Sequence, residues 1–220
     1  MHVEIIETKD GSHSLYSPRF DEAYHSHHGA LAESQHIFIT NGLEAIEKQE
    51  INIFELGFGT GLNALLACAY AEAKGIKINY HSIEFYPVPS EVYTKINYPT
   101  IIGYVEKFQQ IHRADWNEKM QLSPYFSFDK INASIIDIEL DLSDIDIIFF
   151  DAFSPEKQPE MWTTDIFTKV FNILSPGGIL VTYCSKSYVR KNMQQVGFQI
   201  KKIPGPHGKR DMVRATKPVE

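Results

Sequence analysis

The feature that most constrains the fold of this chain is a glycine-rich stretch, INIFELGFGTGLNALLACAYAEA, at residues 51–73. The stretch begins with an apolar run typical of a strand, Ile51 to Leu56. A helical apolar pattern, Leu62 to Lys74, follows the glycines. Gly57, Gly59 and Gly61 fall at the transition, where the absence of a Cβ lets the backbone approach a ligand closely. This order predicts an α/β fold with a nucleotide-type binding loop.

The spacing of this loop argues against two phosphate-binding types. No Gly-Lys-Ser/Thr follows, and the pattern is G-x-G-x-G where a dinucleotide loop has G-x-G-x-x-G. Glu55, two positions before the first glycine, would repel a pyrophosphate but attract an ammonium group. We therefore predict S-adenosylmethionine, whose amino acid end is zwitterionic and whose sulfur is cationic, as the ligand. The predicted donor-binding positions here are Glu55, Gly57, Gly59, Gly61 and Asn63.

Two further acids are predicted to face the same ligand. Glu84 ends the next strand pattern, where a carboxylate can accept hydrogen bonds from two ribose hydroxyls. Asp137 ends the pattern after that and is predicted to accept from an adenine amino group. Asp129, Glu139 and Asp141 compete with Asp137 for this role, and the sequence leaves the choice open.

Strand and helix patterns alternate from residue 51 to residue 196, as a parallel sheet with crossover helices requires. The predicted strands are 51–56, 78–85, 134–138, 146–150 and 178–184, and the predicted helices are 62–74, 163–174 and 187–196. Two short β runs around a Gly/Pro/His turn, residues 197–216, predict a closing antiparallel hairpin. Residues 87–130, rich in Tyr, Pro and Phe, form an insertion with no firm assignment.

The first 50 residues differ from this pattern. Asp10-Gly11 lies between two alternating runs, which predicts a β-hairpin, and polar loop chemistry then leads into a helix from about Leu31. We therefore expect an N-terminal extension, residues 1–50, before a main domain, residues 51–220.

An acidic and aromatic segment, IDIIFFDAFSPEKQPEMW, follows in the second half of the chain. Asp151 comes at the carboxyl end of a buried strand, the edge at which open α/β sheets bind ligands. A carboxylate there can hydrogen-bond an amine and take up charge as the nitrogen is alkylated, while Phe153 can stack on a planar base. The alternative is that Asp151 caps a helix that begins near Pro159. Met161 and Trp162 are predicted to be packing residues.

Charge is distributed unevenly along the chain. The formal net charge is −7, yet residues 186–220 hold nine Lys or Arg and two acids, a net charge of +7, which leaves −14 for the rest. Charge alone leaves open whether this basic module, residues 186–217, is a solvated surface or contacts a polyanion.

Other properties narrow the class of protein. No apolar run approaches the roughly 18 residues of a membrane span, and the acidic N-terminus is unlike a secretory signal, so we expect a cytoplasmic protein. The two cysteines, Cys68 and Cys184, fit reduced core positions. His25, His27, His28 and His36 lack the spacing of a defined metal site, so no metal is predicted.

Taken together, the blocks YHSHHGALAESQHIFITNGL, FELGFGTGLNAL, FFDAFSPEKQPEMWT and PGGILVTYCSKSYVRKNMQQVGFQIKKIPGPHGKRDMVRAT resemble the methyltransferase domain of the MnmC family and its stand-alone form, MnmD. The glycine loop is shared by many methyltransferases, whereas DAFSP followed by P-x-MW, and GF followed by GKR-x-M, are much more specific. The resemblance runs from about Phe20 to Ala215 and so spans nearly the whole chain.

The resemblance implies a class I methyltransferase fold with a mostly parallel, seven-stranded sheet, and S-adenosylmethionine as methyl donor. It implies as acceptor the amine of 5-aminomethyl-(2-thio)uridine at the tRNA wobble position, with Asp151 as the catalytic carboxylate and Glu33 in a lid near the donor. The predicted substrate-binding residues are Phe153 and Pro155 for the base and Lys186, Arg190, Lys209 and Arg210 for tRNA phosphates.

One departure from the family pattern concerns the second, flavin-dependent oxidase domain that MnmC proteins can carry. The chain ends after the predicted hairpin, so we expect a separate enzyme to supply the aminomethyl substrate. Three alternatives stay open: an aminopropyltransferase of the spermidine synthase kind, whose Gly-Gly-Gly-Asp loop is absent here; a small-molecule N-methyltransferase; and a non-catalytic, S-adenosylmethionine-binding RNA-interaction protein.

Overall fold

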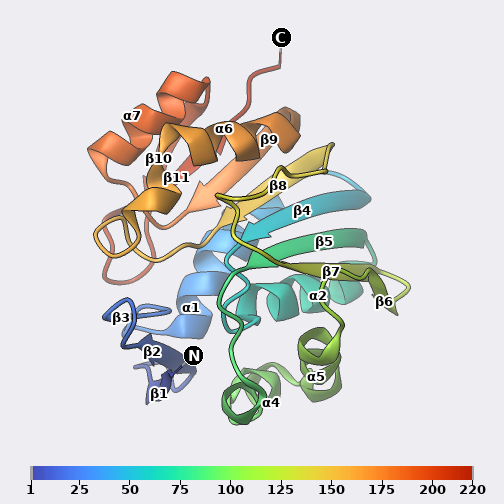
Figure 1. Ribbon diagram of the computed structural model, residues 1–220. Coiled ribbons are helices and arrows are strands. Elements are labelled where there is room, and N and C mark those ends of the chain that lie inside the picture. Colours follow the sequence, from blue (N-terminus) through green and yellow to red (C-terminus); the bar gives the residue numbers. More distant parts are fainter. Residues whose placement is uncertain (1, 220) are drawn as a thin grey trace.

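The computed structural model describes residues 2–219 and is built around an eight-stranded sheet (Figure 1). In spatial order its strands are β10 (Gln199–Pro204), β11 (Asp211–Thr216), β9 (Leu174–Thr182), β8 (Ile145–Phe150), β4 (Glu50–Leu56), β5 (Lys77–Glu84), β7 (Phe126–Asn132) and β6 (Met120–Ser123).

Five neighbouring strands of this sheet, β9, β8, β4, β5 and β7, run parallel to one another. β11 and β10 form the closing antiparallel hairpin predicted from the sequence, with Gln199 opposite Thr216. β6 adds an antiparallel edge beside β7, so the sheet has one strand more than the seven expected. The class I methyltransferase fold is confirmed, because crossover connections join parallel strands in the centre and a hairpin closes one edge.

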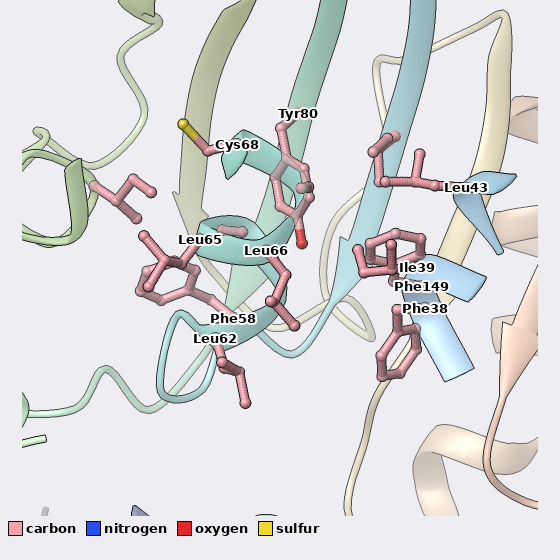
Figure 2. Close-up of a cluster of buried hydrophobic side chains, with 14 of the residues drawn as sticks. Phe38, Ile39, Leu43, Phe58, Leu62, Leu65, Leu66, Cys68, Tyr80 and Phe149 are labelled. Carbon is pink, nitrogen blue, oxygen red and sulfur yellow. The ribbon is translucent and has the colours of Figure 1, made fainter. Parts of the chain in front are cut away.

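Helices cover both faces of the sheet, as Figure 1 shows. One face carries α2 (Leu62–Lys74), α5 (Val105–Arg113) and the short helices α3 (Ser90–Tyr93) and α4 (Tyr98–Ile102), and the other carries α6 (Thr164–Ile173) and α7 (Ser187–Val196). Each layer has its own apolar core. In the first, Leu62, Leu65 and Leu66 of α2 pack with Tyr80 and Phe149 of the sheet (Figure 2). Both cysteines are buried and free, as predicted.

The predicted strand at residues 134–138 is wrong. The third parallel strand at this edge is β7, and Ser134 begins a turn beyond its end, with Ile135 buried in the core. The charged pair Asp129-Lys130 interrupts the apolar pattern of β7, so the sequence did not predict this strand. The apolar run at residues 134–136 has the composition of a strand but forms a turn. The insertion at residues 87–130 therefore contains α3, α4, α5, β6 and most of β7, and supplies one edge of the sheet.

The N-terminal segment forms a second, three-stranded sheet of β1 (Glu4–Glu7), β2 (His13–Ser17) and β3 (Glu22–Ala23). The hairpin predicted at Asp10-Gly11 joins β1 to β2, and the Asp10 carboxylate accepts from the Ser12 backbone N–H at 3.0 Å. The helix expected from about Leu31 is α1 (Ala30–Ser34), which continues as a π-helical segment, Gln35–Thr40.

The turn between β2 and β3 reaches the segment after β8. The Ser154 N–H donates to Glu22 at 2.9 Å, and Lys157 pairs with Asp21 at 2.8 Å. This turn therefore lies across the carboxyl end of the large sheet. Within residues 2–219, no helix has both the length and the hydrophobicity needed to cross a bilayer.

Candidate donor and acceptor site

A cavity of about 790 Å³ opens at the carboxyl ends of β4, β5 and β8, under the turn between β2 and β3. This is the edge at which open α/β sheets bind ligands. It brings together residues that lie far apart in the sequence, from the N-terminal extension to the C-terminal hairpin. The predicted site residues that line it are Glu33, Gly57, Gly59, Asn63, Glu84, Asp137, Asp151, Phe153 and Lys209.

The glycine loop has a backbone shape that side chains would disrupt. Gly57, Gly59 and Gly61 have φ angles of +94°, +52° and +74°, a region that favours glycine. A Cβ on Gly57 would lie 2.7 Å from the Asp151 carbonyl oxygen, and one on Gly61 would lie 2.8 Å from Nε2 of His112. The loop therefore packs directly against the segment that carries Asp151, so donor loop and predicted catalytic acid form one site.

Glu84 is half-buried beside this loop, at the end of β5. Its Oε2 accepts from the Gly59 N–H at 3.0 Å and its Oε1 from the Tyr86 N–H at 2.7 Å, while burial raises the pKa of the carboxyl. Each carboxylate oxygen can accept more than one hydrogen bond, which leaves capacity for ribose hydroxyls in the cavity. Phe85, 52% exposed, and Ile136, 46% exposed, also line the cavity and offer apolar surface to an adenine ring.

These features fit S-adenosylmethionine. The glycines allow close approach, Glu84 presents an anchored carboxylate, and the apolar side chains suit a planar base. Sequence reasoning missed Phe85 and Ile136, although each stands next to an acid that it had singled out. Asp137 lies in the turn after β7 and is exposed, so its predicted contact with adenine would come from a loop.

Glu55 is fully buried at the end of β4, beneath the loop and outside the cavity wall. Its Oε2 accepts from the Ser82 hydroxyl at 2.7 Å, and its Oε1 has no hydrogen-bond partner within residues 2–219. Burial raises the pKa of this carboxyl to about 8. Its role toward a donor ammonium stays a prediction, and a cation above the loop would favour its charged form.

Asp151 follows β8 and faces the cavity. The Asn63 side chain, from the first turn of α2, donates to Asp151 Oδ2 at 2.9 Å. Burial raises the pKa of Asp151 to about 7; the Asn63 bond and Lys209 oppose this rise, and Glu33 adds to it. The helix-cap alternative is wrong, because the short 3₁₀ helix that begins near Pro159, Pro159–Trp162, has Gln158 at its N-cap and no side-chain capping hydrogen bond.

Aromatic rings form the wall next to Asp151. Phe153 stacks on Phe20 from the turn between β2 and β3, with ring centroids 4.3 Å apart and planes at 24°, and Tyr24 meets Phe153 edge-on. The sequence did not indicate Phe20 as a site residue, because only the fold brings it next to Phe153. Pro155 is buried and does not line the cavity. Met161 and Trp162 are buried packing residues, as predicted.

Lys209 lines the cavity, unlike the other three basic residues that were predicted to contact tRNA phosphates. Its Nζ pairs with Glu33 at 2.6 Å and lies 4.0 Å from the ring centroid of Tyr183, inside the cavity wall. Lys186, Arg190 and Arg210 lie outside the cavity, where Lys186 pairs with Glu156 and the Arg190 Nε donates to the Ser185 carbonyl. The Lys209–Glu33 pair joins the C-terminal hairpin to the N-terminal extension over the site.

Comparison with known proteins identifies the class to which this fold and site belong. Residues 92–218, more than half of the chain, match a family model described as S-adenosyl-L-methionine-dependent methyltransferase. The chain belongs to this family, and S-adenosylmethionine is its cofactor.

Particular relatives lie in the group that the motifs indicated. The chain is 30% identical over 97% of its length to the tRNA 5-methylaminomethyl-2-thiouridine biosynthesis bifunctional protein MnmC of Cupriavidus metallidurans, and 31% identical over 92% to that of Actinobacillus pleuropneumoniae. It covers 34% and 33% of these relatives, about a third of their length. The resemblance to MnmC is confirmed.

Solved structures agree with this grouping. The crystal structure of MnmC2 from Aquifex aeolicus superposes with a TM-score of 0.81 at 27% identity, covering all of this chain and 73% of that one. Spermidine synthase from Thermotoga maritima gives 0.60 at 11% identity, covering 99% of this chain and 70% of that one, a likeness that shows the fold alone.

Proposed function

We propose that this methyltransferase converts 5-aminomethyl-(2-thio)uridine at the tRNA wobble position to 5-methylaminomethyl-(2-thio)uridine. The observation that carries the proposal is the contact between the glycine loop and the segment of Asp151, which brings an amine-orienting carboxylate to the donor site. The names of the MnmC relatives support the same acceptor.

Bound S-adenosylmethionine supplies a methyl group carried on a cationic sulfur. The chain then has to present a neutral amine in line with the methyl–sulfur bond, so that a carbon–nitrogen bond forms as that bond breaks. Asp151 accepts a hydrogen bond from the amine, orients its lone pair and takes up the proton that the product nitrogen releases. A pKa of about 7 suits this work, because the carboxylate is then a stronger base than an ordinary aspartate.

The acceptor base enters against Phe153. Because Phe20 covers this ring face, the uracil ring replaces Phe20 in the stack, and the turn between β2 and β3 moves aside during entry. Pro155, which is buried, stiffens the turn after Phe153 because its ring fixes the backbone φ angle.

Exposed cations outside the cavity hold the tRNA. Base-specific recognition of RNA uses splayed single-stranded bases, while phosphate contacts fix orientation. Lys217 donates to the Phe171 and Leu174 carbonyls. We assign phosphate contact to the other basic side chains of the module at residues 186–217 that lie outside the cavity: Lys186, Arg190, Lys191, Lys201, Lys202, Arg210 and Arg214. In this scheme residues 1–50 form the lid-bearing extension and residues 51–220 the methyltransferase domain.

The cellular setting follows from the proposed acceptor. The enzyme works in the cytoplasm, where it meets tRNA, and a separate enzyme supplies the aminomethyl group. The predicted donor contacts of Glu33, Glu55 and Asp137 are retained as parts of this proposal.

The proposal is tested with radiolabelled S-adenosylmethionine and tRNA from cells that lack the terminal methylation, followed by identification of the labelled nucleoside. Label in 5-methylaminomethyl-2-thiouridine supports the assignment. Label on an added polyamine, with none in tRNA, would overturn it in favour of a small-molecule amine acceptor. The Asp141→Asn variant, altered in an exposed loop outside the cavity, serves as an active control.

A further inference from the structure

The insertion at residues 87–130 contacts the glycine loop through one histidine. His112, near the end of α5, is buried, and its Nε2 lies 3.1 Å from the carbonyl oxygen of Thr60 in the loop. A carbonyl oxygen only accepts, so Nε2 carries the proton. Burial lowers the pKa of His112 to about 3, which keeps the ring neutral and this single donor in place.

Aromatic packing orients the ring of His112. It stacks on Tyr93 with centroids 4.1 Å apart and planes at 19°, and Phe108 contacts it edge-on at 4.5 Å. On the loop side, Phe58 packs against it at 5.2 Å. Both hydrogen bonding and packing therefore join α5 to residues 58–60.

Lys130 fixes the end of α5 from which His112 projects. Its buried ammonium donates to the His112 carbonyl at 2.6 Å and the Ile111 carbonyl at 3.1 Å, and lies 4.5 Å from the ring centroid of Trp116. A cation at a helix C-terminus interacts favourably with the helix dipole. The same ammonium lies 5.4 Å from the ring centroid of Phe58, which points into the core beside Leu62 and Leu65 of α2 (Figure 2).

We propose that His112 is a positioning residue for the methyl donor: its Nε2–H holds the Thr60 carbonyl so that the glycine loop keeps its donor-binding shape. His112 does not line the cavity, so it acts through the loop. When this hydrogen bond is removed, the loop populates other shapes in the free protein, and the apparent affinity falls in proportion to the fraction that stays competent. This inference concerns the donor alone and does not depend on the identity of the acceptor.

Two substitutions at His112 separate the hydrogen bond from the packing. His112→Phe keeps an aromatic ring but removes the donor, whereas His112→Gln places an amide N–H at the same number of bonds from the backbone but removes the ring. We expect His112→Phe to raise the dissociation constant for S-adenosylmethionine about 3- to 10-fold, with a melting temperature near that of the unaltered protein. His112→Gln should lower the melting temperature more and stay within about twofold in affinity.

Calorimetric titration with S-adenosylmethionine and thermal unfolding measure both properties on the full chain. His36→Phe is the matched control, because it removes another imidazole-to-carbonyl bond, 2.9 Å to Pro204, away from the loop. The inference is overturned when His112→Phe binds like the unaltered protein, or when His112→Gln loses at least as much affinity as His112→Phe. The second outcome would show that the ring matters only through packing.

Discussion

At the scale of single residues, Asp151 combines position with an altered acidity. It contacts the cavity, is held by Asn63, and has a pKa raised by burial to about 7. Its carboxylate form therefore declines as pH falls through about 7, where an ordinary aspartate stays ionised. Under the proposed mechanism, catalysis requires this ionised form.

We predict that kcat/KM for the acceptor tRNA shows an inflection near pH 7, below which it falls more steeply because Asp151 takes up a proton. Asp151→Asn should lower turnover about 10²- to 10⁴-fold and remove this inflection, with donor affinity within about threefold. Steady-state kinetics between pH 5.5 and about 8.5 and donor titration check these outcomes. An unchanged inflection in the residual activity would assign it to another group.

Glu55 leads to a prediction about stability. Its folded pKa is raised to about 8, so between its ordinary value and 8 the folded state holds a proton that the unfolded state releases. Stability contributed by this group is therefore present at low pH and is lost as pH rises through that window. Because glutamine does not titrate, Glu55→Gln should remove this pH-dependent loss of stability.

Urea unfolding of the ligand-free protein at pH 5 and pH 8 measures this effect. We expect the free energy of unfolding of Glu55→Gln, relative to the unaltered protein, to improve by about 1–3 kcal/mol from the lower to the higher pH. The same relative stability at both values would mean that Glu55 is already ionised when folded.

At the scale of elements, the turn between β2 and β3 and the first residue of β3 are held across the site by three contacts. Phe20 stacks on Phe153, Asp21 pairs with Lys157, and Glu22 accepts from the Ser154 N–H. An aromatic pair contributes about 0.5–1.5 kcal/mol beyond its buried area. Under the proposed function, this contribution opposes entry of the acceptor base.

We predict that Phe20→Ala lowers KM for acceptor tRNA about 2- to 5-fold, because the base no longer displaces a ring. Donor affinity should stay unchanged. Phe85→Ala is the paired comparison, since Phe85 lines the donor side of the cavity and its removal should weaken donor binding instead. A rise of more than threefold in KM for Phe20→Ala would show that Phe20 itself contacts the base.

At the scale of the whole molecule, charge and cavity are separate features. Lys209, first expected to contact phosphates, is paired with Glu33 in the cavity wall, so reversing its charge would disturb the site as well as any tRNA contact. Lys191 and Arg210 are exposed and lie outside the cavity. They provide the cleaner test of the basic module.

For Lys191→Gln with Arg210→Gln, we expect weaker tRNA binding and a salt dependence reduced by about one unit of log–log slope for each phosphate that is no longer neutralised. Donor affinity should not change. The control is Lys77→Gln with Lys119→Gln, which removes the same charge from exposed positions at the start of β5 and just before β6. Equal weakening in both pairs would show that tRNA responds to net charge alone.

Local patterns in the sequence determined where the donor loop and its flanking strand and helix lie, and where Asp151 lies. The apolar runs around Gly57 placed a strand, loop and helix within a residue of where they lie, and a buried strand before Asp151 placed that acid at the ligand edge. These features depend on neighbours in the chain, since periodicity and glycine conformation act over a few residues.

Only the tertiary structure decided which distant segments complete the site. His112 and Thr60 are 52 positions apart, and Lys209 and Glu33 are 176 apart, yet each pair is in contact. The same holds for the true third parallel strand, because β7 is defined by pairing with β5 rather than by its own apolar content. Such contacts depend on how layers pack around the sheet, and the local pattern of a sequence does not encode that packing.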